Sequence, residues 1–208
     1  MKKIPCSLQS YIEEEIIPLY ENFDKAHQTA HAASVIAESL KLAEHYEVKH
    51  AMVYAIAAFH DLGLKEGRDN HHLVSAQIMR METRLKEWFD EEEIELMSEA
   101  VEDHRASNSC APRSIYGMIV AEADRDINPI TILRRTIQYG IYHYPDLSKE
   151  LHYQRFIDHL QEKYAEGGYL QLWIPESKNA LQLVELRKII SDKARLKKLF
   201  DTLYEEEK

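Results

Sequence analysis

Apolar residues recur every three or four positions along most of the chain, which is the periodicity of amphipathic helices. Only six glycines and six prolines interrupt the 208 residues, so little of the sequence suits tight turns. The pattern predicts an all-α protein. A hydrophobic content of 45% over this length is enough for one sizeable core, and we expect a single-domain helical bundle over residues 1–208.

Individual helices can be placed from this periodicity and from local start signals. The periodic stretches are 28–47, 51–59, 70–87, 148–165 and 176–203. A further helix is expected to begin at Asp90, where Glu93 completes a capping box. Others are expected to begin at Pro112 and at Asn128-Pro129, because proline suits the first helical turn. No repeat or low-complexity tract separates these elements.

One predicted helix is apolar on every face. Residues 51–59, AMVYAIAAF, carry no charge, so this helix is expected to be central and surrounded by protein. His60 and Asp61 follow it directly, and Gly63 is placed to end it as its C-terminal glycine. An ionised carboxylate taken into such an apolar setting is costly unless it is paired or bound to a metal.

Either a metal or an ion pair would compensate Asp61. Lys65 and Arg68 lie just beyond it and offer the ion pair. A divalent metal explains His60 and Asp61 together, because imidazole nitrogen and carboxylate oxygen are joint ligands of zinc, iron, manganese and similar ions. A metal needs three or more protein groups, so further ligands are expected on inward-facing helical stripes.

Three other residues are candidates for such ligands. His31 and His104 each share a helical face with apolar residues, although a lone histidine there is more often a hydrogen-bonded core residue. Asp124 ends the apolar run IYGMIVAEA, as Asp61 ends its helix, and a helix cap or an ion pair with Arg125 is the alternative. Core-directed residues of ligand type on four helices favour a shared metal site.

Composition and charge argue against several classes of partner for this site. The formal net charge of −10 repels a polyanion, so bulk binding of nucleic acid is not expected. No segment approaches the roughly 20 apolar residues of a membrane span, and the N-terminus lacks a signal-peptide run. Cys6 and Cys110 fit a reducing compartment rather than a disulfide framework. We expect a cytoplasmic protein without a membrane partner, and the sequence leaves room for a homo-oligomer.

The order and spacing of these residues are those of a known family. The succession of His31, His60-Asp61 and Asp124 within AEADRD resembles the HD superfamily of metal-dependent phosphohydrolases, named for its His-Asp doublet. FHDLGLKEGRDNHHLVSAQIM, EDHRAS and PRSIYGMIVAEADRD are similar to segments of small bacterial HD-domain proteins. The resemblance implies an HD metal-binding core at about 24–140 and a C-terminal helical extension at about 141–208.

The resemblance also implies the ligands. Those of a first metal fall on His31, His60, Asp61 and Asp124. In family members with two metals, histidines between the doublet and the last aspartate bind the second ion. This implies His104 and either His71 or His72, and we favour His71 because Ser75 follows it by one helical turn.

Such a site is suited to hydrolysis of a phosphate ester, because a bound metal lowers the pKa of water from about 15.7 to about 7. The resemblance suggests that Asp61 orients or deprotonates this water, and His104 is a candidate to protonate the leaving oxygen. Lys65, Arg68 and Arg105 are candidates to bind the phosphate. We expect a nucleotide or another small phosphorylated metabolite as substrate, with one or two ions of Mn, Fe, Co, Ni, Zn or Mg.

Other functions compete with this hypothesis. An HD-type di-iron oxygenase would have a nearly identical ligand set. A non-catalytic, ligand-sensing helical protein is the alternative outside enzymes, but it has no evident reason to keep Asp61 and Asp124 buried. A zinc protease does not fit, because HQTAH, which spans His27 and His31, lacks the required glutamate.

Overall fold

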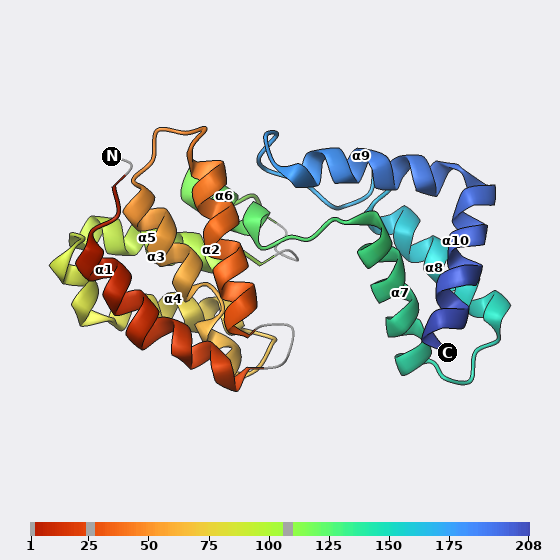
Figure 1. The fold of residues 1–208 in the computed structure, drawn as a ribbon, viewed down its shortest axis with the longest axis horizontal. Coiled ribbons are helices and arrows are strands. Elements are labelled where there is room, and N and C mark those ends of the chain that lie inside the picture. The colour runs from red at the N-terminus through yellow and green to blue at the C-terminus, as the bar shows by residue number, and fades with distance from the viewer. Residues whose placement is uncertain (1–2, 24–27, 106–109) are drawn as a thin grey trace. The chain divides into compact units, whose positions relative to one another are not determined.

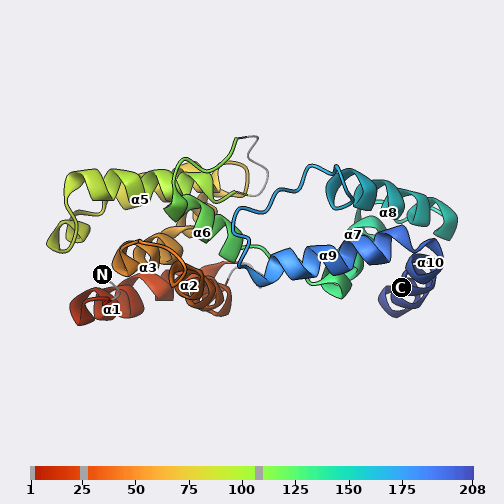
Figure 2. The same cartoon turned by 90° about the horizontal axis from the view of Figure 1, so that it is seen from above.

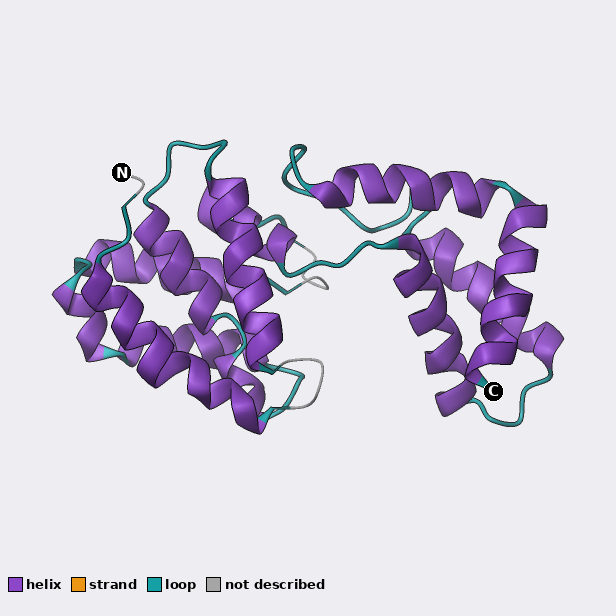
Figure 3. Cartoon of the chain, in the orientation of Figure 1, coloured by secondary structure: helices purple, strands orange, loops and turns teal. Residues whose placement is uncertain are grey.

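The computed structural model describes residues 3–23, 28–105 and 110–208, and every regular element in these ranges is a helix (Figure 3). The expected all-α fold is confirmed. None of the described helices is long and apolar enough to span a membrane. Contacts between Cα atoms group the chain into two compact units, Met1–Arg125 and Asp126–Lys208. Compactness alone does not show whether these units unfold together, so the single-domain expectation stays a prediction.

An apolar helix forms the centre of the first unit. This is α3 (His50–Phe59), in which every side chain from Met52 to Phe59 is buried, as the charge-free sequence predicts. It packs against α2 (Thr29–Ala43), α4 (His71–Met81), α5 (Glu91–Asp103) and α6 (Ile115–Ala123). In Figure 2, α3 lies between α5 on one side and α1 and α2 on the other.

The N-terminal segment, residues 6–22, is helical throughout and was not placed by the sequence pattern. It runs through α1 (Cys6–Tyr11), the π-helical turn η1 (Ile12–Ile16) and the 3₁₀ turn η2 (Ile17–Asn22) (Figure 1). Its inner stripe consists of the buried residues Leu8, Tyr11, Ile12, Ile16 and Tyr20. The segment therefore belongs to the core of the first unit.

Helix starts agree with the sequence better than helix ends do. The capping box of α5 is present, with the Glu93 N–H donating to Asp90 Oδ1 at 2.8 Å. The helix expected over 70–87 instead ends at Met81 and is followed by the 3₁₀ turn η4 (Thr83–Glu87). The start expected at Pro112 is also wrong, because the Ser114 hydroxyl caps α6 by accepting the Gly117 N–H at 3.2 Å.

Gly63 does not act as the C-terminal glycine of α3. It lies inside the 3₁₀ turn η3 (Leu62–Glu66), and Gly67 and Gly167 are the glycines with positive φ among the described residues. Its role is close packing. A Cβ atom on Gly63 would lie 2.1 Å from the carbonyl oxygen of His71, so only glycine lets the start of α4 approach this turn.

The second unit packs four helices around its own core. These are α7 (Pro129–His143), α8 (Lys149–Lys163), α9 (Lys178–Ser191) and α10 (Lys193–Glu207). Asn128 caps α7 as expected, accepting the Thr131 N–H at 3.1 Å. The single helix expected over 176–203 is wrong, because Asp192 ends α9 and caps α10 by accepting the Arg195 N–H at 2.9 Å.

Candidate metal centre

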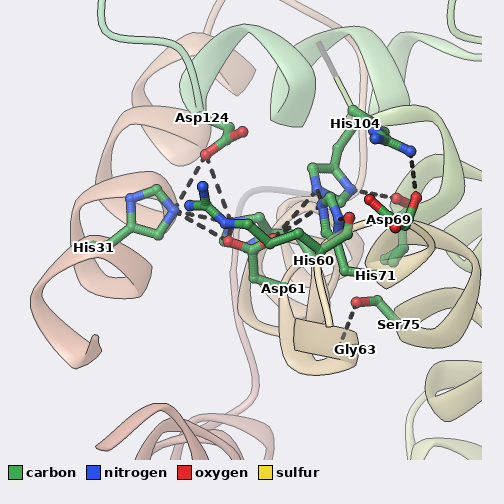
Figure 4. Close-up of polar contacts among 12 residues, drawn as sticks. His31, His60, Asp61, Gly63, Asp69, His71, Ser75, His104 and Asp124 are labelled. Carbon is green, nitrogen blue, oxygen red and sulfur yellow. Dashed lines mark hydrogen bonds and ion pairs between the residues drawn. The ribbon is translucent and has the colours of Figure 1, made fainter. Parts of the chain in front are cut away.

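All six residues expected as metal ligands meet in the first unit, where their side chains point toward one another (Figure 4). They come from different helix ends. His60 follows the last residue of α3, His104 follows that of α5, and Asp124 follows that of α6. His71 is the first residue of α4, and His31 lies in the first turn of α2.

The first cluster contains His31, His60 and Asp124. His31 Nε2 lies 3.2 Å from His60 Nε2 and 3.2 Å from Asp124 Oδ1. His60 Nε2 lies 3.8 Å from the same carboxylate oxygen. Two imidazole nitrogens and one carboxylate oxygen around a common point are a ligand set that divalent transition metals accept.

The second cluster contains Asp61, His71 and His104. The Nε2 atoms of the two histidines are 3.3 Å apart. Asp61 Oδ1 lies 3.5 Å from His71 Nε2 and 3.4 Å from His104 Nε2. His71 therefore occupies the position that the sequence assigned to either His71 or His72.

Asp61 connects the two clusters. Its other carboxylate oxygen, Oδ2, lies 3.5 Å from His31 Nε2 and 3.3 Å from His60 Nε2. One carboxylate thus presents one oxygen to each cluster. This arrangement can hold two ions with Asp61 as their shared ligand, and it matches the binuclear site that the sequence left open.

Backbone carbonyls orient three of the four histidines. The Nδ1 atoms of His60, His71 and His104 lie 2.7, 2.8 and 2.5 Å from the carbonyl oxygens of Ala57, Arg68 and Val101, each three residues earlier in the chain. A carbonyl oxygen only accepts, so Nδ1 donates and carries the proton. Nε2 faces the cluster, and once it gives up its proton it is the nitrogen that can bind a metal.

The surroundings favour cations. The ends of α3, α5 and α6 that reach the site are C-terminal ends, which carry partial negative charge. Four histidines, His31, His60, His71 and His104, lie within ion-pair distance of Asp61 or Asp124.

The pKa values reflect the crowding of acids and imidazoles. Burial acts to lower the pKa of His31, but its hydrogen bonds with Asp124 and Asp61 outweigh burial and raise the pKa to about 9. Burial acts to raise the pKa of Asp61, yet His60, His104 and His31 hold it far below its usual value. Burial lowers the pKa of His71. The two carboxylates stay ionised, as ligands must be.

A pocket of about 250 Å³ opens over the second cluster. It is lined by Asp61, Leu64, Arg68, His71, His104, Arg105 and Asp124. Two of the three cations expected to bind phosphate, Arg68 and Arg105, are thus beside the clusters. The third, Lys65, lines a different pocket together with Val74 and Met81.

Sequence reasoning about the remaining histidines has mixed outcomes. His72 is buried beside His71 but belongs to neither cluster. Its pKa is lowered to about 4, mainly by burial and also by the charge of Arg105, so its ring is neutral. His27 lies outside the described residues. One residue that contacts the doublet was missed: Tyr20, whose hydroxyl lies 3.3 Å from the Asp61 nitrogen.

Comparison with known families agrees with this geometry. Residues 26–128 match the family model of the HD domain, and this range includes all six residues of the two clusters. This is an HD-domain protein. None of the curated proteins compared with it matches the chain.

A solved structure shares the fold of this HD-domain protein. It is the crystal structure of a predicted HD superfamily hydrolase from an uncultured Thermotogales bacterium. The two chains are 19% identical, and the match covers 77% of this chain and 91% of the other with a TM-score of 0.50. At this identity the similarity shows the fold alone.

Proposed function

We propose that this HD-domain protein is a metal-dependent hydrolase that cleaves phosphate esters of small metabolites, with nucleotides as the first candidates. The observation that carries the proposal is the shared carboxylate of Asp61, which joins two ligand clusters under one pocket. Divalent ions held there would supply water of lowered pKa and positive charge for phosphoryl oxygens.

The chain's own groups would hold and orient the reacting parts. His31, His60 and Asp124 would hold one ion, His71 and His104 the other, and Asp61 both. Because carbonyl oxygens fix three of the imidazole rings, little reorganisation is needed when ligands bind. Asp61, whose pKa is strongly lowered, would remain an anion and accept a hydrogen bond from the attacking water.

Arginines at the pocket supply the complementary charge. Arg68 and Arg105 are the candidates for the phosphate group, because a guanidinium donates two parallel hydrogen bonds to phosphate oxygens. Arg105 also donates to the carbonyl oxygen of Asp69, which fixes its position beside the pocket. Lys65, on the other pocket, would reach only parts of the substrate beyond the phosphate.

The geometry argues against His104 as the acid that protonates the leaving oxygen. His104 Nδ1 faces a carbonyl oxygen and Nε2 faces the second cluster, so both ring nitrogens are engaged. This favours His104 as a ligand. The charge on the leaving oxygen would then be neutralised by the ions and by the arginines of the pocket.

The experiment is a hydrolysis screen of the full chain. Protein stripped of metal is reloaded with Mn²⁺, Fe²⁺, Co²⁺, Ni²⁺, Zn²⁺ or Mg²⁺ and assayed for phosphate release from nucleotides and sugar phosphates. We expect release that requires metal and is lost in Asp61→Ala. Glu92→Gln, an exposed carboxylate in the first turn of α5, is the matched control and should keep full activity.

Two outcomes would reject the proposal. Oxygen consumption by the iron-loaded protein without phosphate release would indicate the di-iron oxygenase. Phosphate release that is equal in wild type and Asp61→Ala would mean that the clusters do not catalyse it.

A further inference from the structure

The hydroxyl of Tyr20 contacts the backbone of the His-Asp doublet from outside the HD domain. Tyr20 lies in η2, before the family match begins at residue 26, and its side chain is fully buried. Its hydroxyl donates to the carbonyl oxygen of Ala58 at 2.9 Å. The same hydroxyl accepts the backbone N–H of Asp61 at 3.3 Å.

Both of these backbone groups need partners. Ala58 is in the last turn of α3, where carbonyl groups have no partner within the helix. Asp61 leaves the helix with φ −111° and ψ 6°, so its N–H points away from the regular ladder. Buried backbone groups without partners are costly, and one hydroxyl satisfies both.

The orientation of the Asp61 backbone determines the geometry of both clusters. Its Oδ2 lies 3.3 Å from His60 Nε2, and its Oδ1 lies 3.4 Å from His104 Nε2. Any rotation of the Asp61 backbone would therefore displace a ligand in both clusters at once. Partners that orient ligands through hydrogen bonds typically change metal affinity by about 10- to 100-fold when they are removed.

The segment that carries Tyr20 is itself held in place at its other end. The Tyr11 ring stacks on Trp88 with centroids 5.5 Å apart. Trp88 Nε1 donates to Ser7 Oγ at 2.9 Å, and Arg84 forms an ion pair with Glu15. The position of the Tyr20 hydroxyl is thus fixed by contacts that lie away from the clusters.

We propose that Tyr20 is a positioning residue of the metal centre, whose hydroxyl holds the backbone of Asp61 so that one carboxylate serves both clusters. The N-terminal segment is then a working part of the site. The inference rests on the proposed binding of metal by the two clusters, and it adds a residue that lies before the range matched to the HD domain.

The test is Tyr20→Phe in the full chain, which keeps the buried ring and removes both hydrogen bonds. Titration of metal-free protein with Mn²⁺, followed by calorimetry, should show affinity at least 10-fold weaker for both ions. Tyr11→Phe is the matched control, because it removes a hydroxyl hydrogen bond to Glu82 from the same segment, far from the doublet. It should bind Mn²⁺ as wild type does.

Hydrogen exchange gives a second readout without metal or turnover. The Asp61 amide of metal-free wild type should exchange slowly, and Tyr20→Phe should accelerate its exchange at least 10-fold while Tyr11→Phe does not. Fast exchange in wild type would overturn the proposal even if Tyr20→Phe failed to fold. Equal losses of melting temperature in the two variants, with unchanged Mn²⁺ affinity, would reduce Tyr20 to a structural role and overturn it as well.

Measurements of Mn²⁺ binding distinguish an error about the metal centre from an error about the role of Tyr20. Wild-type protein that binds no Mn²⁺ would reject the metal centre and this inference with it. Wild-type protein that binds two ions, with Tyr20→Phe binding them equally well, would reject only the positioning role.

Discussion

Asp61 is surrounded by imidazoles, and this determines what the residue does without metal. His31, His60 and His104 lie within 3.5 Å of its two oxygens. Their charge and hydrogen bonds keep the pKa of the buried carboxyl low despite burial. The carboxylate is therefore compensated in the metal-free protein as well.

Asp61→Asn should consequently lose metal binding and also destabilise the metal-free protein. Removing one partner of a buried, hydrogen-bonded charge cluster costs about 3 kcal/mol or more. Denaturant unfolding of metal-free protein at pH 7 measures this loss. A metal-free variant as stable as wild type would contradict the geometry described for Asp61, and exposed Glu92→Gln provides the baseline.

The raised pKa of His31 predicts opposite pH trends for stability and for metal binding. Its pKa rises from 6.5 to about 9 because hydrogen bonds to Asp124 and Asp61 outweigh burial. A raised pKa stabilises the folded state fully below pH 6.5, and this stabilisation is lost as the pH rises through 9. Metal must displace the same proton, so Mn²⁺ affinity should increase over that interval.

Two titrations check these trends. Unfolding of the metal-free protein should become easier from pH 6.5 to 9, while calorimetry shows tighter Mn²⁺ binding and release of protons. His31→Gln should flatten both curves. Parallel trends, in which metal-free stability and Mn²⁺ affinity both rise with pH, would contradict the assignment.

Among individual residues, the sequence predicted those that belong to a recognisable motif. His31, His60-Asp61 and Asp124 follow from their buried helices and from the family pattern, and the structure brings them together. The structure also places His71, which the spacing to Ser75 favoured, in the second cluster and leaves His72 outside both. Tyr20 could not be found in this way, because it acts through hydrogen bonds to backbone groups that leave no pattern in the sequence.

At the scale of elements, the contact between η3 and α4 positions the second cluster. Gly63 N–H donates to Ser75 Oγ at 2.8 Å, and the backbone of His71 passes directly over the glycine. The distance between the doublet and the first turn of α4 therefore depends on Gly63 having no side chain. This explains the glycine after the doublet better than a helix-ending role does.

Gly63→Ala should force α4 away from η3. The added Cβ would lie 2.1 Å from the His71 carbonyl oxygen and 2.7 Å from the Ser75 nitrogen, and overpacking of this kind costs about 1–3 kcal/mol. Thermal unfolding and Mn²⁺ titration should show lower stability and a weaker second ion. Gly117→Ala, whose Cβ would lie 3.1 Å from Pro112, is the milder control. Equal effects of the two variants would contradict this role for Gly63.

Most helix starts, although not the one expected at Pro112, were predictable because they depend on local side chains. Asp90 and Asn128 cap their helices as expected. Helix ends were harder: the turn at Asp192 separates α9 from α10 within a continuous amphipathic pattern. The periodicity of 176–203 continues across this turn, so the break is marked by the local cap at Asp192 and not by the apolar pattern.

At the scale of the whole molecule, the ligands and the second core are in different units. All six candidate ligands lie between residues 31 and 124, inside the unit Met1–Arg125. The second unit has its own buried core, which includes Leu133, Phe156, Leu186 and Phe200. The boundary at residues 125 and 126 falls close to the end of the family match at 128.

Calorimetric unfolding tests the single-domain expectation. A ligand at 100 times its dissociation constant stabilises the structure that binds it by about 2.7 kcal/mol. If the chain is one domain, a single transition should move to higher temperature with Mn²⁺. Two transitions, of which only one moves, would contradict the expectation and assign the metal to the first unit alone.

The most direct test of the central claim is the number of Mn²⁺ ions bound per chain in wild type, in three variants of the clusters and in one control variant. Two clusters that share Asp61 predict two ions in wild type, one in His31→Ala, one in His71→Ala and none in Asp61→Ala. The exposed variant Glu92→Gln should still bind two. Wild type that binds no ion, or Asp61→Ala that keeps one, would contradict the shared carboxylate on which this account depends.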